Sequence, residues 1–414
     1  IKTLTRGQTL AQATEVYRGE QGDGGYGVSA SVLRDGRGAV LAVLFNRPLD
    51  TFSSETVQWL DGRAVKLSLP AKVNVQGAIR DQLIFSVDQA WTQAGETFSA
   101  GSLMSAPLAG LRDGQGRADA IFVPGDRQSV EEVAVFDNRV VATVYDNVRG
   151  QMMRFLDTRG RGWLKADLEV PDNVAVHLGD SSRATDRQFY SFEGFLTPPT
   201  LNLLDMRVGT AGRSEQIASA PARFDASRDV VEQFEATSSD GTKIPYFVVR
   251  PRDLVMDGHA PTIMYGYGGF QVSKPPAYIP EMVTQHPELI NAAVIESPLV
   301  DMLRYHELPA GASWIGEYGD PRIPEEAAWI ARYSAYQQLR PEMDYPRVYI
   351  TTNTRDDRVH PGHARKFAAR LGDQGHDHLY FEDTAGGHSN DADPVANARR
   401  WARHYVYLAQ QLMD

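Results

Sequence analysis

Short apolar runs separated by polar turns dominate the first half of the chain. Four of these runs follow turns that contain an aspartate, namely Asp35, Asp81, Asp137 and Asp186, at steps of 46, 56 and 49 residues. A repeat of about fifty residues with several short strands is typical of the blades of a β-propeller. A β-sandwich or a barrel is the alternative that the strand pattern leaves open. The four apolar runs are residues 39–45, 83–87, 140–145 and 189–192.

The second half alternates apolar strands with amphipathic helices, a pattern that predicts a parallel sheet. In the last helix, Val395, Trp401 and Tyr405 belong to an apolar series with helical spacing. The character of the chain changes near residues 226–230, so we expect a first domain of about four blades over residues 1–228 and an α/β domain over residues 229–414. The predicted strands are residues 261–265, 291–295, 348–350 and 379–381, and the predicted helices are residues 324–339, 362–371 and 394–412.

The charge balance and the absence of cysteine exclude several classes of function. Asp and Glu number 53 against 42 Lys and Arg, so the formal net charge is −11. An acidic chain of this kind has no electrostatic case for binding nucleic acid or an anionic membrane surface. It also contains no apolar run of about eighteen residues that could span a bilayer. Without cysteine there are no disulfides, thiolate zinc sites or cysteine nucleophiles.

The start of the chain indicates a cut amino terminus. Residues 1–4 read Ile-Lys-Thr-Leu, with neither a methionine nor a signal-type apolar run. We expect a monomeric cytoplasmic protein without a cofactor, and the periplasm is the alternative compartment.

Two loops at one edge of the predicted sheet carry an acid and a histidine. Asp356 lies in the polar loop after the strand at residues 348–350, and His388 follows the strand at residues 379–381 within an Ala-Gly-Gly-His sequence. Reactive groups collect at the carboxyl ends of parallel strands. An imidazole base needs a carboxylate to fix its tautomer and to stabilise the imidazolium. Asp356 and His388 therefore predict the acid–base half of a Ser–His–Asp system, in the chain order of α/β-hydrolases. Solvated turns are the structural alternative.

Two further motifs could contribute a binding surface, and one stretch could bind a metal. Residues 265–270 read Tyr-Gly-Tyr-Gly-Gly-Phe, where glycines allow close approach of a ligand and a phenol can donate to an oxyanion. Trp314 could support a flat apolar ring, although either motif could equally be a turn or core packing. His360 and His363 lie in a stretch rich in potential metal ligands, but no metal fingerprint such as His-Glu-x-x-His is present. We therefore expect no metal site.

Several blocks of the chain, in the same order, resemble the prolyl oligopeptidase family of serine peptidases. The resemblance implies a β-propeller domain followed by an α/β-hydrolase domain, and cleavage of short peptides on the carboxyl side of proline. Short proline-containing peptides would then be the partners. The blocks are residues 195–199, 241–245, 261–270, 300–306, 314–319, 356–359 and 386–388.

The resemblance also implies a role for each matching residue. Asp356 would be the triad acid and His388 the general base, while Tyr267 would donate to the oxyanion. Arg358 would bind the substrate backbone. Trp314 would stack on the proline ring, and Phe270 and Tyr318 would help to line the same pocket.

One part of the family pattern is missing from this sequence. A serine nucleophile sits on a strand–turn–helix elbow with the pattern Gly-x-Ser-x-Gly, and no such pattern occurs in the chain. In the family the elbow precedes block 300–306, whereas here Met282 runs directly into Val283. About two βαβ units, each of roughly thirty residues or more, would be missing between these two residues. The first blades of the propeller would be missing as well, at the amino end of the chain.

We therefore expect a serine endopeptidase whose 414-residue form is inactive. The alternatives are a non-catalytic propeller binding protein, or a related dipeptidyl or acylaminoacyl peptidase.

Overall fold

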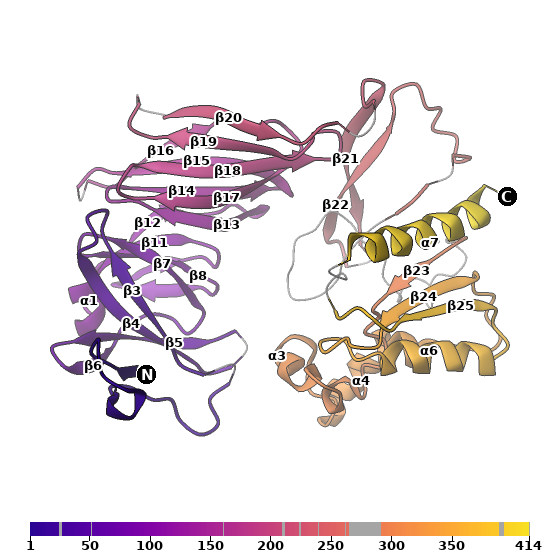
Figure 1. Cartoon of the computed structure of the whole chain (residues 1–414), viewed down its shortest axis with the longest axis horizontal. Coiled ribbons are helices and arrows are strands. Elements are labelled where there is room, and N and C mark those ends of the chain that lie inside the picture. The colour runs from indigo at the N-terminus through magenta and orange to yellow at the C-terminus, as the bar shows by residue number, and fades with distance from the viewer. Residues whose placement is uncertain are drawn as a thin grey trace. The chain divides into compact units, whose positions relative to one another are not determined.

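The computed structural model divides the chain into two compact units, Ile1–Leu254 and Val255–Asp414 (Figure 1). The first unit consists of strands with short turns, and the second combines strands and helices. The structure describes residues 1–24, 27–50, 52–159, 161–208, 212–222, 225–238, 240–260, 262–264, 291–388 and 393–413.

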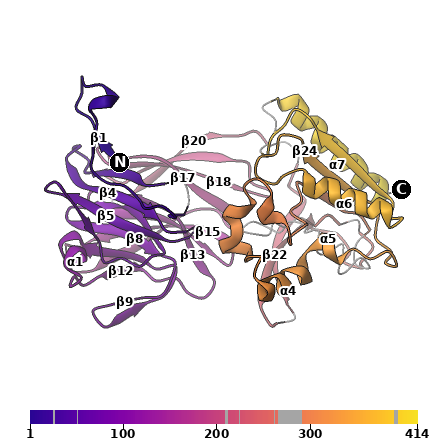
Figure 2. The same ribbon diagram turned by 90° about the horizontal axis from the view of Figure 1, so that it is seen from below.

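The first unit contains four four-stranded antiparallel sheets that follow one another along the chain (Figures 1 and 2). We call them blades one to four. In the second blade a small hairpin is inserted between the second and third strands. Four consecutive meanders of this kind are typical of the blades of a β-propeller, as the sequence predicts.

The strand bounds of the four blades are as follows. Blade one contains β3 (Ser29–Arg34), β4 (Val40–Pro48), β5 (Ser54–Leu60) and β6 (Arg63–Lys66). Blade two contains β7 (Val73–Ile79), β8 (Gln82–Val87), β11 (Leu103–Pro107) and β12 (Asp119–Phe122), with the inserted hairpin β9 (Trp91–Gln93) and β10 (Glu96–Phe98) and the helix α1 (Leu108–Asp113). Blade three contains β13 (Gln128–Val135), β14 (Arg139–Asp146), β15 (Arg149–Asp157) and β16 (Trp163–Leu168). Blade four contains β17 (Val174–Ser182), β18 (Arg187–Gly194), β19 (Thr200–Asp205) and β20 (Arg213–Ser219). The short elements β1 (Lys2–Thr3), η1 (Leu10–Gln12) and β2 (Thr14–Glu15) precede the blades.

Apolar cores lie between neighbouring blades. Leu44 of β4 shares a core with Phe85 of β8, whereas the adjacent Ile84 belongs to a different core that includes Val140 of β14. Val141 in turn belongs to a third core, shared with blade four. Successive side chains of a strand point to opposite faces of its sheet, so each inner blade contributes to the core on either side of it. The runs of consecutive apolar residues in the sequence arise from this two-sided burial.

The hairpin of β21 (Asp229–Thr237) and β22 (Lys243–Pro251) groups with the first compact unit. The sequence instead places residues 229–251 at the start of the second domain. The domain division at residue 228 remains a prediction.

The second unit contains a parallel sheet in the order β23–β24–β25, as the alternation of strands and helices predicts. Helices α6 and α7 cover opposite faces of this sheet (Figure 1). Ile350 shares a core with Phe367 of α6, whereas the adjacent Tyr349 packs on Tyr407 of α7 with ring centroids 5.6 Å apart. The bounds are β23 (Val294–Glu296), β24 (Val348–Asn353), β25 (His378–Asp383), α6 (Gly362–Asp373) and α7 (Pro394–Leu412).

The predicted helix at residues 324–339 is divided in two at Ser334. This residue has an extended backbone, with φ −72° and ψ 105°. Its hydroxyl accepts the N–H of Met302 at 2.9 Å and donates to the carbonyl of Val300 at 2.8 Å, so tertiary hydrogen bonds compensate for the interrupted helix. The helices of this region are η3 (Tyr305–Glu307), η4 (Gly311–Trp314), α3 (Ile315–Tyr318), α4 (Pro324–Tyr333) and α5 (Ala335–Gln338).

Two further expectations differ from the structure. Residues 262–264 are not part of a strand, and the rest of the predicted strand, Pro261 and Tyr265, lies outside the described residues. The apolar series read on α7 is exposed, with 45% of Trp401 and 60% of Tyr405 accessible. The sheet is instead contacted through Tyr407, whose hydroxyl accepts the N–H of Ala293 at 3.0 Å.

Candidate active site

The carboxyl ends of β24 and β25 bring together the two loops that carry the predicted acid and base. Asp356 follows the end of β24 by three residues, and His388 follows the end of β25 by five. Asn353 ties the loops together because its side-chain amide donates to the carbonyl of Gly387 at 2.8 Å. A Cβ atom on Gly386 would lie 3.0 Å from Asn353 Oδ1, so glycine permits this close approach.

Asp356 and His388 form a hydrogen-bonded pair. His388 Nδ1 lies 2.9 Å from each carboxylate oxygen of Asp356. The side chain of Asp356 is fully buried, whereas 29% of the His388 side chain is accessible. A carboxylate can only accept, so Nδ1 carries the proton and Nε2 of the neutral ring keeps a free lone pair. This is the arrangement of a general base held by an acid.

Local backbone groups also hold the Asp356 carboxylate. Its Oδ1 accepts the N–H of Arg358 at 3.0 Å and the N–H of Val359 at 2.8 Å. Burial by itself raises the pKa of this carboxyl, but the hydrogen bond and charge of His388, together with the two N–H groups, hold the pKa below its usual value. Asp356 is therefore ionised at neutral pH and orients the imidazole.

The structure groups some of the other predicted residues. Trp314 and Tyr318 pack around the buried Tyr305, whose hydroxyl donates to the carbonyl of Gly319 at 2.6 Å. The rings of Tyr305 and Tyr318 meet edge to face at 5.9 Å. The side chain of Arg358 is exposed on the loop that carries Asp356. Two predicted site residues, Tyr267 and Phe270, lie outside the described residues.

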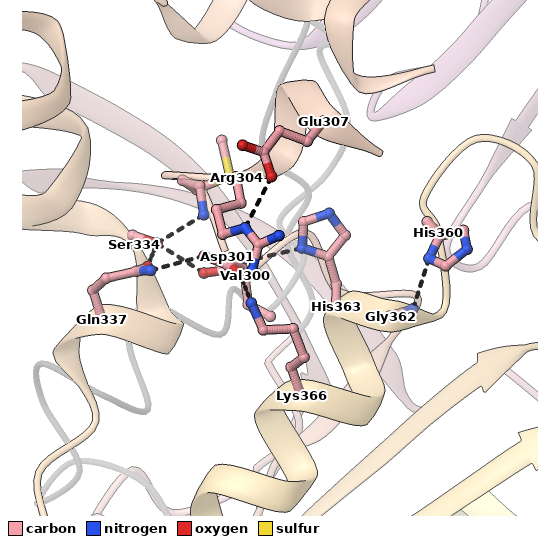
Figure 3. A network of polar contacts seen from close by, with 11 residues as sticks. Val300, Asp301, Arg304, Glu307, Ser334, Gln337, His360, Gly362, His363 and Lys366 are labelled. Atoms are coloured by element: carbon pink, nitrogen blue, oxygen red, sulfur yellow. Dashed lines mark hydrogen bonds and ion pairs between the residues drawn. The ribbon is translucent and has the colours of Figure 1, made fainter. Parts of the chain in front are cut away.

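A buried carboxylate beside helix α6 forms a second polar network that sequence reasoning missed (Figure 3). Only 2% of the Asp301 side chain is accessible, and it forms an ion pair with Lys366 of α6. Its other oxygen accepts from Gln337 Nε2 at 2.7 Å. The N–H of Asp301 donates to Nδ1 of His363, at 3.1 Å, so the start of α6 is fixed directly after the Asp356 loop. In the sequence, the only signal for this network is the resemblance of residues 300–306 to a block of the prolyl oligopeptidase family.

His360 and His363, which the sequence offers as candidate metal ligands, accept backbone hydrogen bonds in the structure. His363 Nδ1 accepts the Asp301 N–H, and His360 Nδ1 accepts the N–H of Gly362 at 3.1 Å. Among the residues that the structure describes, no group of three or more His, Asp or Glu side chains could hold a metal ion. In the same part of the chain, no helix is long and apolar enough to cross a membrane.

Family models match both halves of the chain. Residues 50–215 match the N-terminal β-propeller domain of prolyl oligopeptidase, and residues 277–414 match the prolyl oligopeptidase family. In solved structures, the chain resembles a post-proline cleaving enzyme from Rickettsia typhi with a TM-score of 0.84 and 23% identity, covering 98% of this chain and 70% of that one. That likeness shows the propeller and α/β-hydrolase fold.

Curated relatives extend beyond this chain. An uncharacterized peptidase of Sinorhizobium fredii is 34% identical, with 100% of this chain and 67% of the relative covered. An uncharacterized peptidase of Rickettsia prowazekii is 26% identical, covering 84% and 58%, and a prolyl endopeptidase of Elizabethkingia miricola is 25% identical, covering 51% and 40%. The chain thus spans two thirds or less of the length of these three relatives.

The alignment with the Sinorhizobium relative also contains gaps in this chain. It runs over 497 positions, whereas the chain has 414 residues, so at least 83 positions (497 less 414) have no counterpart here. Sequence identity across the full chain, together with the two family matches and the fold, leads to one conclusion. The chain is a member of the prolyl oligopeptidase family of serine-type peptidases.

Proposed function

We propose that this chain carries the acid and the base of a serine endopeptidase that hydrolyses short peptides on the carboxyl side of proline. The contact between His388 Nδ1 and Asp356 carries the proposal, because it leaves Nε2 free to take a proton from a nucleophile. Family membership and the relatives named prolyl endopeptidase support the peptide class.

The other predicted residues have roles in substrate binding under this proposal. Arg358, exposed two residues after the acid, donates to a carbonyl of the substrate backbone. Trp314 stacks on the proline ring, and Tyr318 lines the same pocket. Tyr267 and Phe270 have the oxyanion and pocket roles given by the resemblance.

The nucleophile is supplied, we propose, by a segment that the 414-residue sequence lacks between Met282 and Val283. Both residues lie outside the described part of the chain. The absence of Gly-x-Ser-x-Gly from the sequence and the 83 unmatched positions support this. The chain as given is then inactive, because an acid–base pair without a nucleophile has nothing to activate.

Labelling of the natural protein tests the proposal. We expect its intact mass to exceed that of the 414-residue chain, and a fluorophosphonate probe to label one serine between Met282 and Val283. Changing His388 to alanine should abolish labelling as well as hydrolysis of a succinyl-Gly-Pro reporter. A folded natural protein that the probe does not label would overturn the assignment to serine peptidases.

A non-catalytic binding protein is the alternative, favoured by the lack of a nucleophile motif in the sequence. It requires the 414-residue chain to fold stably without further segments. A cooperative thermal transition of this chain, combined with a natural mass equal to its own, would favour the alternative.

A further inference from the structure

The turns at one end of the four blades surround a cavity of about 510 Å³, which we call the arginine cavity. It lies wholly in the first unit, and the proposed peptidase chemistry does not use it. Five arginines and three aspartates line it, a formal charge of +2 in a chain whose net charge is −11. The charged lining residues are Arg37, Arg80, Arg159, Arg183, Arg207, Asp35, Asp137 and Asp186.

Three of these arginines come from turns of the same construction, an Asp-x-Arg sequence at the end of a strand. In each turn the aspartate Oδ1 accepts the backbone N–H of the arginine two residues later, which fixes the start of the arginine side chain. The three N–H···O distances are 2.9 Å from Arg37 to Asp35, 2.8 Å from Arg159 to Asp157 and 3.1 Å from Arg207 to Asp205. Blades one, three and four each contribute one such turn.

Of the three guanidinium groups, that of Arg207 is paired with a carboxylate, whereas those of Arg37 and Arg159 can bind a ligand. Arg207 forms an ion pair with its own aspartate, at 2.5 Å. The carboxylate of Asp157 instead pairs with Arg80 of blade two, so Arg159 loses its nearest counter-ion. Within the part of the chain that the structure describes, the guanidinium groups of Arg37 and Arg159 have no hydrogen bond or ion pair. Unpaired guanidinium forks from blades one and three therefore lie at the same cavity.

The frame of the cavity is fixed by contacts among all four blades. Arg183 of blade four pairs with Asp137 of blade three at 3.0 Å and donates to the carbonyl of Ala78 in blade two at 2.9 Å. Asp137 also accepts the N–H of Gly36 in blade one at 2.8 Å. A Cβ on Gly36 would lie 2.9 Å from the backbone carbonyl oxygen of Arg183, so this turn favours glycine. Arg183 lines a second cavity of about 450 Å³ between the inner strands as well, so the two cavities adjoin.

We propose that the arginine cavity binds a short acidic peptide, with the guanidinium groups of Arg37 and Arg159 each taking a carboxylate. An arginine fork matches a carboxylate with two parallel hydrogen bonds. The same lining contains oxygen acceptors on Asp186, Thr185 and Asn138, which suit the N–H groups of a peptide. Arg139 already contacts Asp186 Oδ2 and Asn138 Oδ1, which leaves the second carboxylate oxygen of Asp186 and the hydroxyl of Thr185 as the main acceptors. Lining carboxylates repel a dense polyanion, so the site favours carboxylates spaced along a peptide over phosphate.

Calorimetric titration of the 414-residue chain tests the proposal without any need for hydrolysis. The probes are a blocked pentapeptide alternating glycine and glutamate, the same peptide with glutamine, and inorganic phosphate. We expect binding of the acidic peptide that weakens with added salt, and at least tenfold weaker binding of the other two. A double variant, Arg37→Ser with Arg159→Ser, should bind the acidic peptide at least tenfold more weakly than the wild type.

A matched control removes two exposed arginines elsewhere in the same unit. Arg6→Ser with Arg63→Ser changes the net charge equally but leaves the cavity intact, and should keep wild-type affinity. Equal thermal transitions of the three proteins would show that none is misfolded. Equal loss in both double variants, phosphate binding as tight as peptide binding, or no binding of the acidic peptide would each overturn the proposal.

Discussion

Two buried carboxylates in the second unit have different hydrogen-bond partners, and these partners indicate different roles for the two side chains. Asp356 is held by His388 and by two backbone N–H groups, whereas Asp301 is held by Lys366 and Gln337. An imidazole can both accept and donate a proton in general acid–base catalysis, whereas an ammonium group beside a buried carboxylate balances its charge. We therefore propose that the first pair takes part in proton transfer and that the second anchors α6.

His363 provides a test of the buried network at the level of one residue. Burial lowers the pKa of its imidazole from 6.5 to about 4, against the opposing charge of Asp301. Below pH 6.5 this imidazole takes up a proton in the unfolded chain, whereas in the native protein it stays neutral until the pH approaches about 4. The free energy of unfolding should therefore fall as the pH drops towards about 4. The loss should level off below that pH, at a total of about 3 kcal/mol.

Urea unfolding at a series of pH values measures this dependence. In His363→Asn the amide oxygen can replace Nδ1 as acceptor for Asp301, and the titrating ring is gone. The variant should therefore lose less stability than the wild type over the same acidic range. Identical pH profiles for the two proteins would show that His363 is not the group responsible.

Among the elements of the second unit, α6 connects the candidate site to the buried network. It begins six residues after Asp356, and its Lys366 reaches Asp301. The sequence predicts this helix and both strands beside it, because apolar periodicity is a local signal. It does not predict the Asp301 contacts, since Gln337 and Lys366 lie 36 and 65 residues away along the chain. The break at Ser334 was missed for the same reason.

Lys366→Met should destabilise the second unit by about 3 kcal/mol, because it leaves the Asp301 carboxylate buried without its cation. Adding Asp301→Asn should recover part of the loss, since the uncompensated charge is then removed. Urea denaturation of the single and double variants measures both changes.

The matched control is Lys165→Met, which removes a lysine from an exposed pair with Asp167 in which 45% and 74% of the side chains are accessible. It should cost less than about 0.5 kcal/mol. If the two lysine variants prove equally stable, the Asp301 pair does not anchor the helix.

For the molecule as a whole, the propeller is the part most fully predicted, because a turn aspartate marks each blade in the sequence. The second unit is less fully predicted from the sequence. Among the described residues β23 pairs with β24 alone, and the apolar side chains Trp401 and Tyr405 of α7 are exposed. If the proposed additional segment between Met282 and Val283 is present in the natural protein, we expect it to pair with β23 and to cover this surface.

The most direct test of the acid–base assignment is nuclear magnetic resonance of the 414-residue chain labelled with ¹⁵N at histidine. In alkaline solution we expect His388 to carry its proton on Nδ1, with slow solvent exchange, and to have an unprotonated Nε2. Asp356→Ala should abolish that protected proton. A His388 ring protonated on Nε2 in the wild type, or one unchanged by Asp356→Ala, would contradict the account.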